Sequence, residues 1–359
     1  MNNTVIFLSE EQQNFSQQYS GLQVTRVSSQ HHNLYSVLDT NNHSFQAIVS
    51  GKLNHIIDAT EQYPVVGDYV MVNLPANPND DAIIHHILPR KTLLTRGIKE
   101  GITIQPMVAN IDTVFITVSL NENFNLRRIE RYLVVVNDSH AKPVILLTKS
   151  DQCNDISTKI SAVTEIAPRV PIITTSLDNF KSLSDYILPG KTSAFIGSSG
   201  VGKSTIINHL LGYRAVTTLP IRENDSKGRH TTTTRQLFTT NNGAMIIDTP
   251  GMREMQINFT TNDVTTFEEI EVLSQQCHFK NCHHKTEPGC AIRSAISDGK
   301  LSEKRFRNYQ KLQRETLYAN LNNHDIESEK FKRFYGSKSE AKRVNHYTKK
   351  KDKYKYDNW

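Results

Sequence analysis

The sequence has no long unbroken apolar run, few cysteines and few aromatic residues. Of 359 residues, 37% are hydrophobic and 8% aromatic, and no stretch is apolar enough to cross a membrane. Four cysteines are too few for a secreted scaffold built on disulfides. The first residues have no basic segment followed by a long apolar one, so neither a signal peptide nor a transit peptide is expected. These absences favour a soluble protein of the cytoplasm.

Positive charge is concentrated at the C-terminal end. Residues 330–359 contain eleven Lys/Arg and three acids, a local charge of +8, which leaves 6 − 8 = −2 for the first 329 residues. Tyrosines and Trp359 are interspersed with the cations. Such a tail can neutralise phosphates and stack on unpaired bases, or it can be a solvated, disordered end. The sequence leaves both interpretations open.

Residues 1–90 are expected to form a β-barrel domain. Turn residues separate five strand-like segments, at 22–27, 33–38, 45–49, 66–74 and 82–88. Five short strands in about 70 residues fit an OB-fold, which often binds RNA, although a barrel can also simply pack on its neighbour. Whether residues 1–18 are ordered is left open.

The rest of the chain divides into three further parts. A basic linker is predicted at 91–108 and an α/β domain at 109–261, and residues 262–359 are expected to form a mostly helical domain that ends in the basic tail. Apolar runs rich in Val and Ile are typical of strands buried on both faces of a parallel sheet. The runs lie at 113–118, 144–147, 170–173, 193–196 and 244–247.

The segment GSSGVGKS at 197–204 matches the phosphate-binding P-loop, because it follows a strand and begins an amphipathic helix. Backbone N–H groups of such a loop surround phosphates, Lys203 reaches the outer phosphates and the Ser204 hydroxyl holds Mg²⁺. In DTPG at 248–251, Asp248 can bind the Mg²⁺ shell and Gly251 can approach the terminal phosphate. The predicted phosphate-site residues are Gly197, Ser198, Ser199, Gly200, Val201, Gly202, Lys203, Ser204 and Thr205.

Base recognition is assigned to TKSD, which comprises Thr148, Lys149, Ser150 and Asp151. The Asp151 carboxylate can accept two hydrogen bonds from guanine N1 and N2, which adenine cannot offer, while the Lys149 stem covers the ring. The usual element begins with Asn, and Thr148 has a shorter hydrogen-bonding reach. The loop 174–176 is a weaker candidate for contacting the guanine oxygen. TKSD precedes the P-loop, whereas it comes last in ordinary small GTPases, so the order indicates a circularly permuted GTPase.

With these motifs, the chain resembles the bacterial ribosome-small-subunit-dependent GTPase A family across nearly all of residues 20–359. The resemblance is carried by TKSD, GSSGVGKS, GRHTTT at 228–233, DTPG and a Cys/His cluster. It implies an OB barrel, a permuted P-loop GTPase and a zinc domain. It also implies binding of GTP and GDP, of the 30S subunit and its 16S rRNA, and action late in 30S maturation, alongside other assembly factors. A monomer is expected.

Many GTPases have a glutamine directly after the DxxG motif, where it orients the attacking water. In this sequence Met252 occupies that position and cannot orient a water molecule. His230 lies in a polar segment between the P-loop helix and DTPG and is the candidate catalytic residue. Thr232 can offer its hydroxyl to Mg²⁺, although Thr231 or Thr233 can equally be the residue that faces the metal. The resemblance implies the same roles.

The spacing C-x4-C-x-H-x5-C brings together Cys277, Cys282, His284 and Cys290. Three thiolates and an imidazole close a tetrahedral, structural Zn²⁺ site. His283 is a rival ligand, and the resemblance favours His284. Disulfides are the alternative use of these cysteines.

The sequence therefore predicts a GTPase with one zinc ion, and with Mg²⁺ bound alongside GTP, that hydrolyses GTP slowly alone and faster on the 30S subunit. One alternative is a different P-loop ATPase or kinase acting on nucleic acid. The other is a non-enzymatic RNA-binding assembly factor that uses GTP only as a structural ligand.

Overall fold

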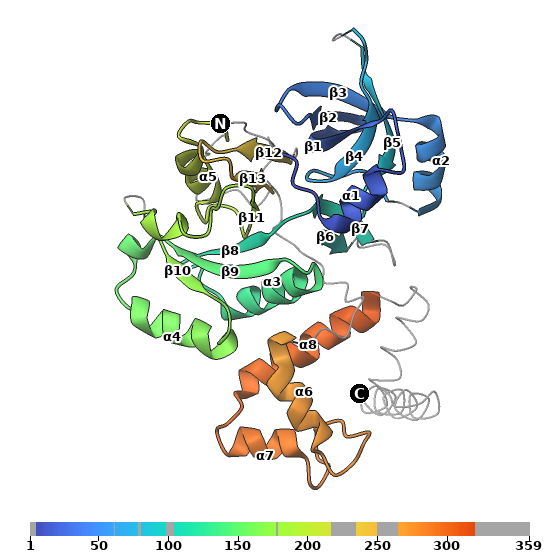
Figure 1. Cartoon of the computed structure of the whole chain (residues 1–359). Helices are drawn as coiled ribbons and strands as arrows, with labels where there is room; N and C mark the ends of the chain where they lie inside the picture. The colour runs from blue at the N-terminus through green and yellow to red at the C-terminus, as the bar shows by residue number, and fades with distance from the viewer. Residues whose placement is uncertain are drawn as a thin grey trace, which may run out of the picture.

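The computed structural model describes residues 5–60, 62–77, 80–97, 104–176, 179–216, 235–249 and 265–319. In this part of the chain a small barrel, a central sheet with helices, and a cluster of C-terminal helices lie next to one another (Figure 1). The predicted multidomain class is confirmed. No described helix is both long enough and apolar enough to span a bilayer.

Five strands close into the N-terminal barrel. They are β1 (Gln23–His31), β2 (Leu34–Leu38), β3 (Ser44–Val49), β4 (Tyr69–Asn73) and β5 (Ala82–Ile87). The strand order is β1-β2-β3-β5-β4, and β4 pairs again with β1. Helix α2 (Gly51–Thr60) connects β3 to β4 and packs Leu53 and Ile57, one helical turn apart, into the barrel core. This is the topology expected for an OB-fold.

Residues 5–18, whose order the sequence left open, have a defined structure before the barrel. Helix α1 (Glu10–Ser16) begins with a capping box, in which the Ser9 side chain accepts from Gln12 N–H and the Gln12 side chain accepts from Ser9 N–H. Phe15 and Tyr19 pack near His86 of the barrel. Helix α1 therefore lies against the barrel as part of that domain.

Residues 91–108 are not a plain linker, which corrects the prediction. Strands β6 (Leu93–Gly97) and β7 (Ile104–Ala109) form an antiparallel pair. Leu94 and Val108 are fully buried in the core shared with the central sheet, while Lys91 and Arg96 face solvent. Lys91 and Arg96, two of the basic residues that suggested a linker, are thus exposed positions before and near the end of an ordered strand.

The central sheet supplies the platform for the predicted nucleotide site. Its order is β10-β9-β8-β11-β13-β12, with only β12 antiparallel. The strands are β8 (Thr113–Ser119), β9 (Lys142–Thr148), β10 (Ile172–Thr174), β11 (Thr192–Ile196), β12 (Gln236–Thr239) and β13 (Met245–Asp248). Strand β12 also pairs with β1 through Gln236 and Ser29, so the sheet continues into the barrel.

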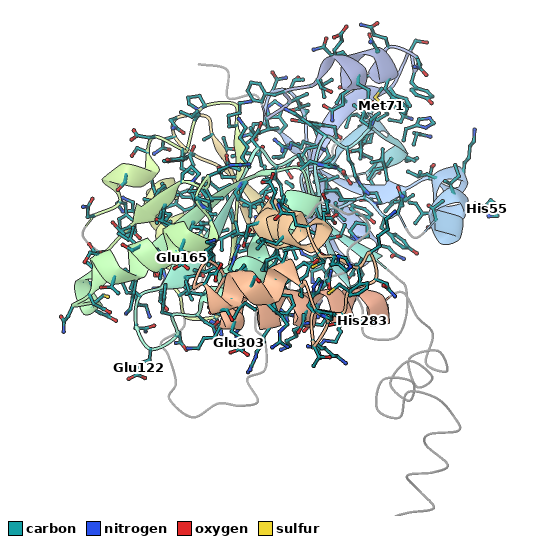
Figure 2. All side chains as sticks on the ribbon, turned by 90° about the horizontal axis from the view of Figure 1, so that it is seen from below. His55, Met71, Glu122, Glu165, His283 and Glu303 are labelled. Atoms are coloured by element: carbon teal, nitrogen blue, oxygen red, sulfur yellow. The ribbon has the colours of Figure 1, made fainter. Side chains whose placement is uncertain are left out.

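Helices pack beside the strands of the central sheet, and further helices follow in the C-terminal part of the chain. The helices of the α/β part are α3 (Leu126–Asp138), α4 (Ile156–Ile166) and α5 (Lys203–Leu211), and short 3-10 turns lie at Ser150–Gln152 and Lys181–Leu183. A 3-10 turn at Thr265–Phe267 leads to α6 (Glu268–Gln275), α7 (Ala291–Ser297) and α8 (Glu303–Ala319). Ile270, Ile292 and Leu312 of these C-terminal helices share one hydrophobic core with α3. Seen from below, they lie in front of the central sheet (Figure 2).

Candidate nucleotide and metal sites

The predicted base and phosphate motifs meet at one edge of the central sheet. TKSD begins at Thr148, the last residue of β9, and the P-loop directly follows β11, with β8 between the two strands. Because the three strands are parallel, their carboxyl ends lie on the same edge, where α/β proteins bind ligands. Asp248 ends β13 and is in register with Phe195, two residues before Gly197. The structure thus brings together motifs that are about 50 to 100 residues apart in the sequence.

The P-loop has the backbone that a phosphate cradle needs. Gly197, Gly200 and Gly202 have φ angles of 150°, 76° and 102°, a region that favours glycine. At Gly197 a Cβ atom would lie 2.2 Å from the carbonyl oxygen of Thr117, so no side chain fits there. Gly202 is the N-cap of α5, so the loop leads directly into a helix N-terminus, which favours anions.

Charged groups lie beside this loop. The Lys203 ammonium donates to the carbonyls of Gly197 at 2.7 Å and Ser198 at 2.8 Å, which holds the cation against the loop. Burial raises the pKa of the Asp248 carboxyl, and the charge of Lys203 acts in the opposite direction. A buried carboxylate next to a phosphate cradle gains from a nearby cation, and Mg²⁺ fits this donor chemistry. Ser204 and Thr205, the next residues of α5, are half-buried.

The base motif is joined to both neighbouring loops by hydrogen bonds. The Thr148 hydroxyl donates to the carbonyl of Val201 in the P-loop at 2.6 Å. The backbone N–H and the hydroxyl of Ser150 both donate to the carbonyl of Thr175 at 3.1 Å, so the loop 174–176 lies directly beside TKSD. Asp151 is exposed, as a carboxylate that reads an incoming base must be. Lys149 has a φ of 58° in the left-handed region.

Four predicted metal ligands come together in the C-terminal helices. The ligand atoms of Cys277, Cys282, His284 and Cys290 all lie within 4.8 Å of one another. Cys277 Sγ is 4.0 Å from Cys290 Sγ and 3.5 Å from His284 Nδ1. In a tetrahedral site with Zn–S bonds of ~2.3 Å, neighbouring sulfurs are ~3.8 Å apart, so the donor set fits Zn²⁺.

The structure supports neither a disulfide nor His283 as a ligand at this cluster. All four cysteines of the chain are free, so the disulfide alternative is not found here. The rival His283 is not part of the cluster. Instead, His284 has a φ of 57°, and its Nε2 atom lies 3.4 Å from the Ser274 hydroxyl. A partner on the second ring nitrogen fixes the orientation of a ligating histidine.

Three predicted site residues, His230, Thr232 and Gly251, lie outside the described residues, as do the alternatives Thr231 and Thr233 and the basic tail. In the described part, sequence reasoning missed Ser274 and also Arg128, whose guanidinium lies 3.3 Å from the Ser198 hydroxyl. Neither belongs to a recognisable motif, so only the three-dimensional contact identifies them.

Comparisons with known proteins agree with this arrangement. Residues 87–258 match the RsgA GTPase family. The chain is 46% identical over 322 residues to the small ribosomal subunit biogenesis GTPase RsgA 2 of Lactiplantibacillus plantarum, covering 89% of this chain and 90% of that protein. The small ribosomal subunit biogenesis GTPase RsgA of Methanosarcina acetivorans is 43% identical over 300 residues, with coverage of 82% and 80%.

Solved structures give the same result. YjeQ from Thermotoga maritima is 27% identical with a TM-score of 0.60, covering 82% of this chain and 99% of that chain. YloQ, described as a circularly permuted GTPase, is 25% identical with a TM-score of 0.57, covering 83% and 96%. The permuted order of TKSD and the P-loop and the identity along nearly the whole chain lead to one conclusion, that this protein belongs to the RsgA GTPase family.

Proposed function

We propose that this protein is a cytoplasmic, monomeric GTPase that binds the 30S ribosomal subunit, assists its late maturation and hydrolyses GTP slowly until the subunit is bound. The observation that carries the proposal is the hydrogen bond from Thr148 to Val201, because it joins a base-reading loop to a phosphate cradle. The printed names of the relatives, small ribosomal subunit biogenesis GTPases, support the choice of subunit.

In this proposal the two loops hold opposite ends of one GTP or GDP molecule. Asp151 accepts from the guanine edge, and the P-loop N–H groups and Lys203 hold the phosphates. Ser204 and Asp248 contribute to the Mg²⁺ shell, and Mg²⁺ neutralises charge on the phosphates when it is bound. His230 acts on the attacking water, Thr232 faces Mg²⁺ and Gly251 approaches the terminal phosphate. These three roles are proposed from the sequence alone.

The C-terminal cluster is proposed to hold one structural Zn²⁺. Cys277, Cys282, His284 and Cys290 fill all four tetrahedral positions, which leaves no open position for chemistry. Zinc binding then contributes to the folding of the loop 277–290. Metal analysis of freshly purified, reduced protein is expected to find one zinc per chain, and its absence would refute this assignment.

The C-terminal region is also the better candidate for contacting RNA phosphates. Residues 20–90 contain three Lys/Arg and six acids, so the barrel has little positive charge to offer. On α8, by contrast, four cations recur at intervals of three or four residues and therefore share one face. They are Lys304, Arg307, Lys311 and Arg314. The basic tail follows α8 in the sequence, and the two together can bind the backbone of 16S rRNA.

One hydrolysis assay tests the proposal against its alternatives. Phosphate release is measured with 30S subunits, with 50S subunits and with neither, and ATP is added as a competitor. We expect stimulation by 30S subunits alone and no competition by ATP. Equal competition by ATP would favour another P-loop enzyme acting on nucleic acid, and binding without any phosphate release would favour a non-enzymatic assembly factor.

A further inference from the structure

Helix α3 contacts both the P-loop and the C-terminal helices. Its N-cap is Asn125, whose side chain accepts a hydrogen bond from the Arg128 N–H. The helix is amphipathic, with Ile129 and Leu133 in the core that it shares with α6, α7 and α8. A rigid helix between two sites can carry a displacement from one to the other, provided that specific contacts hold it at both ends.

At the P-loop, the contact is made by Arg128. Its Nη1 atom lies 3.3 Å from the Ser198 hydroxyl and 3.4 Å from the carbonyl of Asn123. The carbonyl of the same Ser198 accepts from Lys203 at 2.8 Å. Ser198 is therefore held by two cations, one from α5 and one from α3.

At the C-terminal helices, the contacts are made by the next residues of α3. Glu130 is 3% exposed, and its two carboxylate oxygens accept from Arg305 and from Asn308 of α8. Arg131 lies 2.9 Å from the carboxylate of Glu315, also on α8. A buried carboxylate is strongly unfavourable without its partners, so α8 has one preferred position on α3.

These contacts fall within a single turn. Arg128, Glu130 and Arg131 are separated by at most three residues, an axial rise of roughly 4.5 Å at about 1.5 Å per residue. The backbone of one turn does not stretch, so a displacement of the turn of α3 that α8 contacts would also displace Arg128. Figure 1 shows α8 lying close beneath α3.

We propose that Arg128 is a positioning residue of the P-loop, and that the docking of α8 on α3 sets the position of Arg128 and thereby the affinity for guanine nucleotides. The inference rests on the proposed nucleotide site and adds a means by which the C-terminal region acts on it. A partner that displaces α8 would weaken nucleotide binding through this helix.

A double-mutant cycle on the full-length, zinc-loaded protein tests the coupling. Arg128→Ala removes the contact with Ser198, and Glu315→Gln weakens the contact of α8 with Arg131. Affinities for fluorescent GDP and GTP analogues are measured. We expect a loss of about 5- to 10-fold for Arg128→Ala and about 2- to 3-fold for Glu315→Gln, the range for single polar contacts. The double variant is expected to bind no more weakly than Arg128→Ala.

Matched controls separate this effect from a general loss of charge or stability. Arg127→Ala removes an exposed arginine from the neighbouring position of α3. The nucleotide affinity of this variant is expected to stay within about 2-fold of that of the wild type, because substitutions of exposed residues usually have small effects. Glu303→Gln changes a glutamate of α8 that is 60% exposed, pairs with Arg307 and points away from the fold (Figure 2). Arg128→Lys keeps the charge and is expected to restore part of the affinity. Thermal melting of each variant confirms folding.

The outcomes are distinguishable. If the two losses simply multiply in the double variant, docking of α8 does not act through Arg128 and the coupling is overturned. If Arg128→Ala leaves both affinities unchanged while slowing hydrolysis, Arg128 is a catalytic residue and not a positioning one. Wild-type protein that binds no guanine nucleotide would instead refute the proposed function.

Discussion

The hydroxyl of Thr148 donates a hydrogen bond to the backbone carbonyl of Val201 over 2.6 Å. These two residues belong to different motifs, TKSD, which we propose reads the base, and the P-loop, and lie 53 positions apart. Thr148 is 3% exposed, so water does not compete for the bond. Although threonine is shorter than the asparagine usual at this position, the P-loop backbone comes close enough for a hydroxyl. The link fixes the spacing between TKSD and the P-loop, the proposed base-binding and phosphate-binding ends of the site.

Removing this hydroxyl should weaken nucleotide binding. Thr148→Val preserves the shape but leaves the buried Val201 carbonyl without this donor, at a cost of about 1–3 kcal/mol. If about 1 kcal/mol of this cost appears as lost binding free energy, we expect the affinity for GDP to fall by roughly 5- to 10-fold. Titration with a fluorescent GDP analogue measures the change. Thr148→Ser keeps the hydroxyl and serves as the control; an equal loss in both variants would show that the methyl group matters and the bond does not.

Base choice should change with one side chain. Asp151→Asn replaces a carboxylate that accepts from guanine N1 and N2 by an amide, which presents an N–H to the guanine N2 group. We expect GTP affinity to fall by about 100-fold or more, because a site built for paired hydrogen bonds rejects mismatches strongly. Xanthosine triphosphate, whose oxygen replaces the N2 group, should bind better to the variant than GTP does. A competition experiment between GTP and xanthosine triphosphate measures the preference of the variant. An unchanged preference for GTP would show that Asp151 does not recognise the base.

The sequence predicted the strands of the fold well because their patterns are local. The runs at 113–118 and 193–196 became β8 and β11 almost unchanged, since strands buried on both faces are continuously apolar. Elements with weaker patterns were missed. Helix α1 is nearly all polar and is set by its capping box, β12 has four residues at the edge of the α/β strands, and the β6-β7 pair is hidden by its basic residues.

The site was predictable to the extent that its chemistry is written in motifs. In the P-loop, in TKSD and in the spacing of the proposed zinc ligands, several functional groups lie close together in the sequence, so a short stretch of backbone brings them together. Arg128 and Ser274 reach the site from other elements, and no spacing in the sequence reports their distance from Ser198 or His284. Contacts of this kind depend on how helices pack, which single-sequence patterns do not encode.

The junction between barrel and central sheet should depend on Arg26. This fully buried side chain donates to the carbonyls of Val5, Gly67 and Asn110 and to the Thr192 hydroxyl, and it lies over the Tyr69 ring. Arg26→Lys offers a compact ammonium that cannot reach acceptors in so many directions. We expect a loss of about 2–4 kcal/mol in unfolding free energy, since buried acceptors lose their donors.

Urea denaturation followed by fluorescence measures this loss. Lys52→Met, at an exposed position of α2 in the same barrel, is the control and is expected to stay within about 0.5 kcal/mol of the wild type. A comparable stability of Arg26→Lys and wild type would mean that the junction does not rely on the guanidinium.

The loop that carries His284 should show a defined pH dependence through Glu287. Backbone N–H groups of Glu287 itself, Lys285, His283 and Thr286 lower the pKa of this carboxyl from 4.5 to about 2. Since the folded pKa lies below the unfolded one, the carboxylate stabilises the loop above pH 4.5, and this contribution is lost as the pH falls from 4.5 toward 2.

Glu287→Gln should therefore loosen the metal loop at neutral pH, because the amide accepts fewer of these hydrogen bonds than the carboxylate does. At pH 7 we expect zinc to pass to a chelator about 10-fold more readily than from the wild type, the lower end of the range for residues that orient metal ligands. In melting experiments on chelator-treated protein, the difference between variant and wild type should shrink between pH 4.5 and pH 3. Glu303→Gln, whose carboxylate pairs with an exposed arginine of the same helix, provides the control. A difference that stays constant over this range would show that the Glu287 carboxylate does not hold the loop.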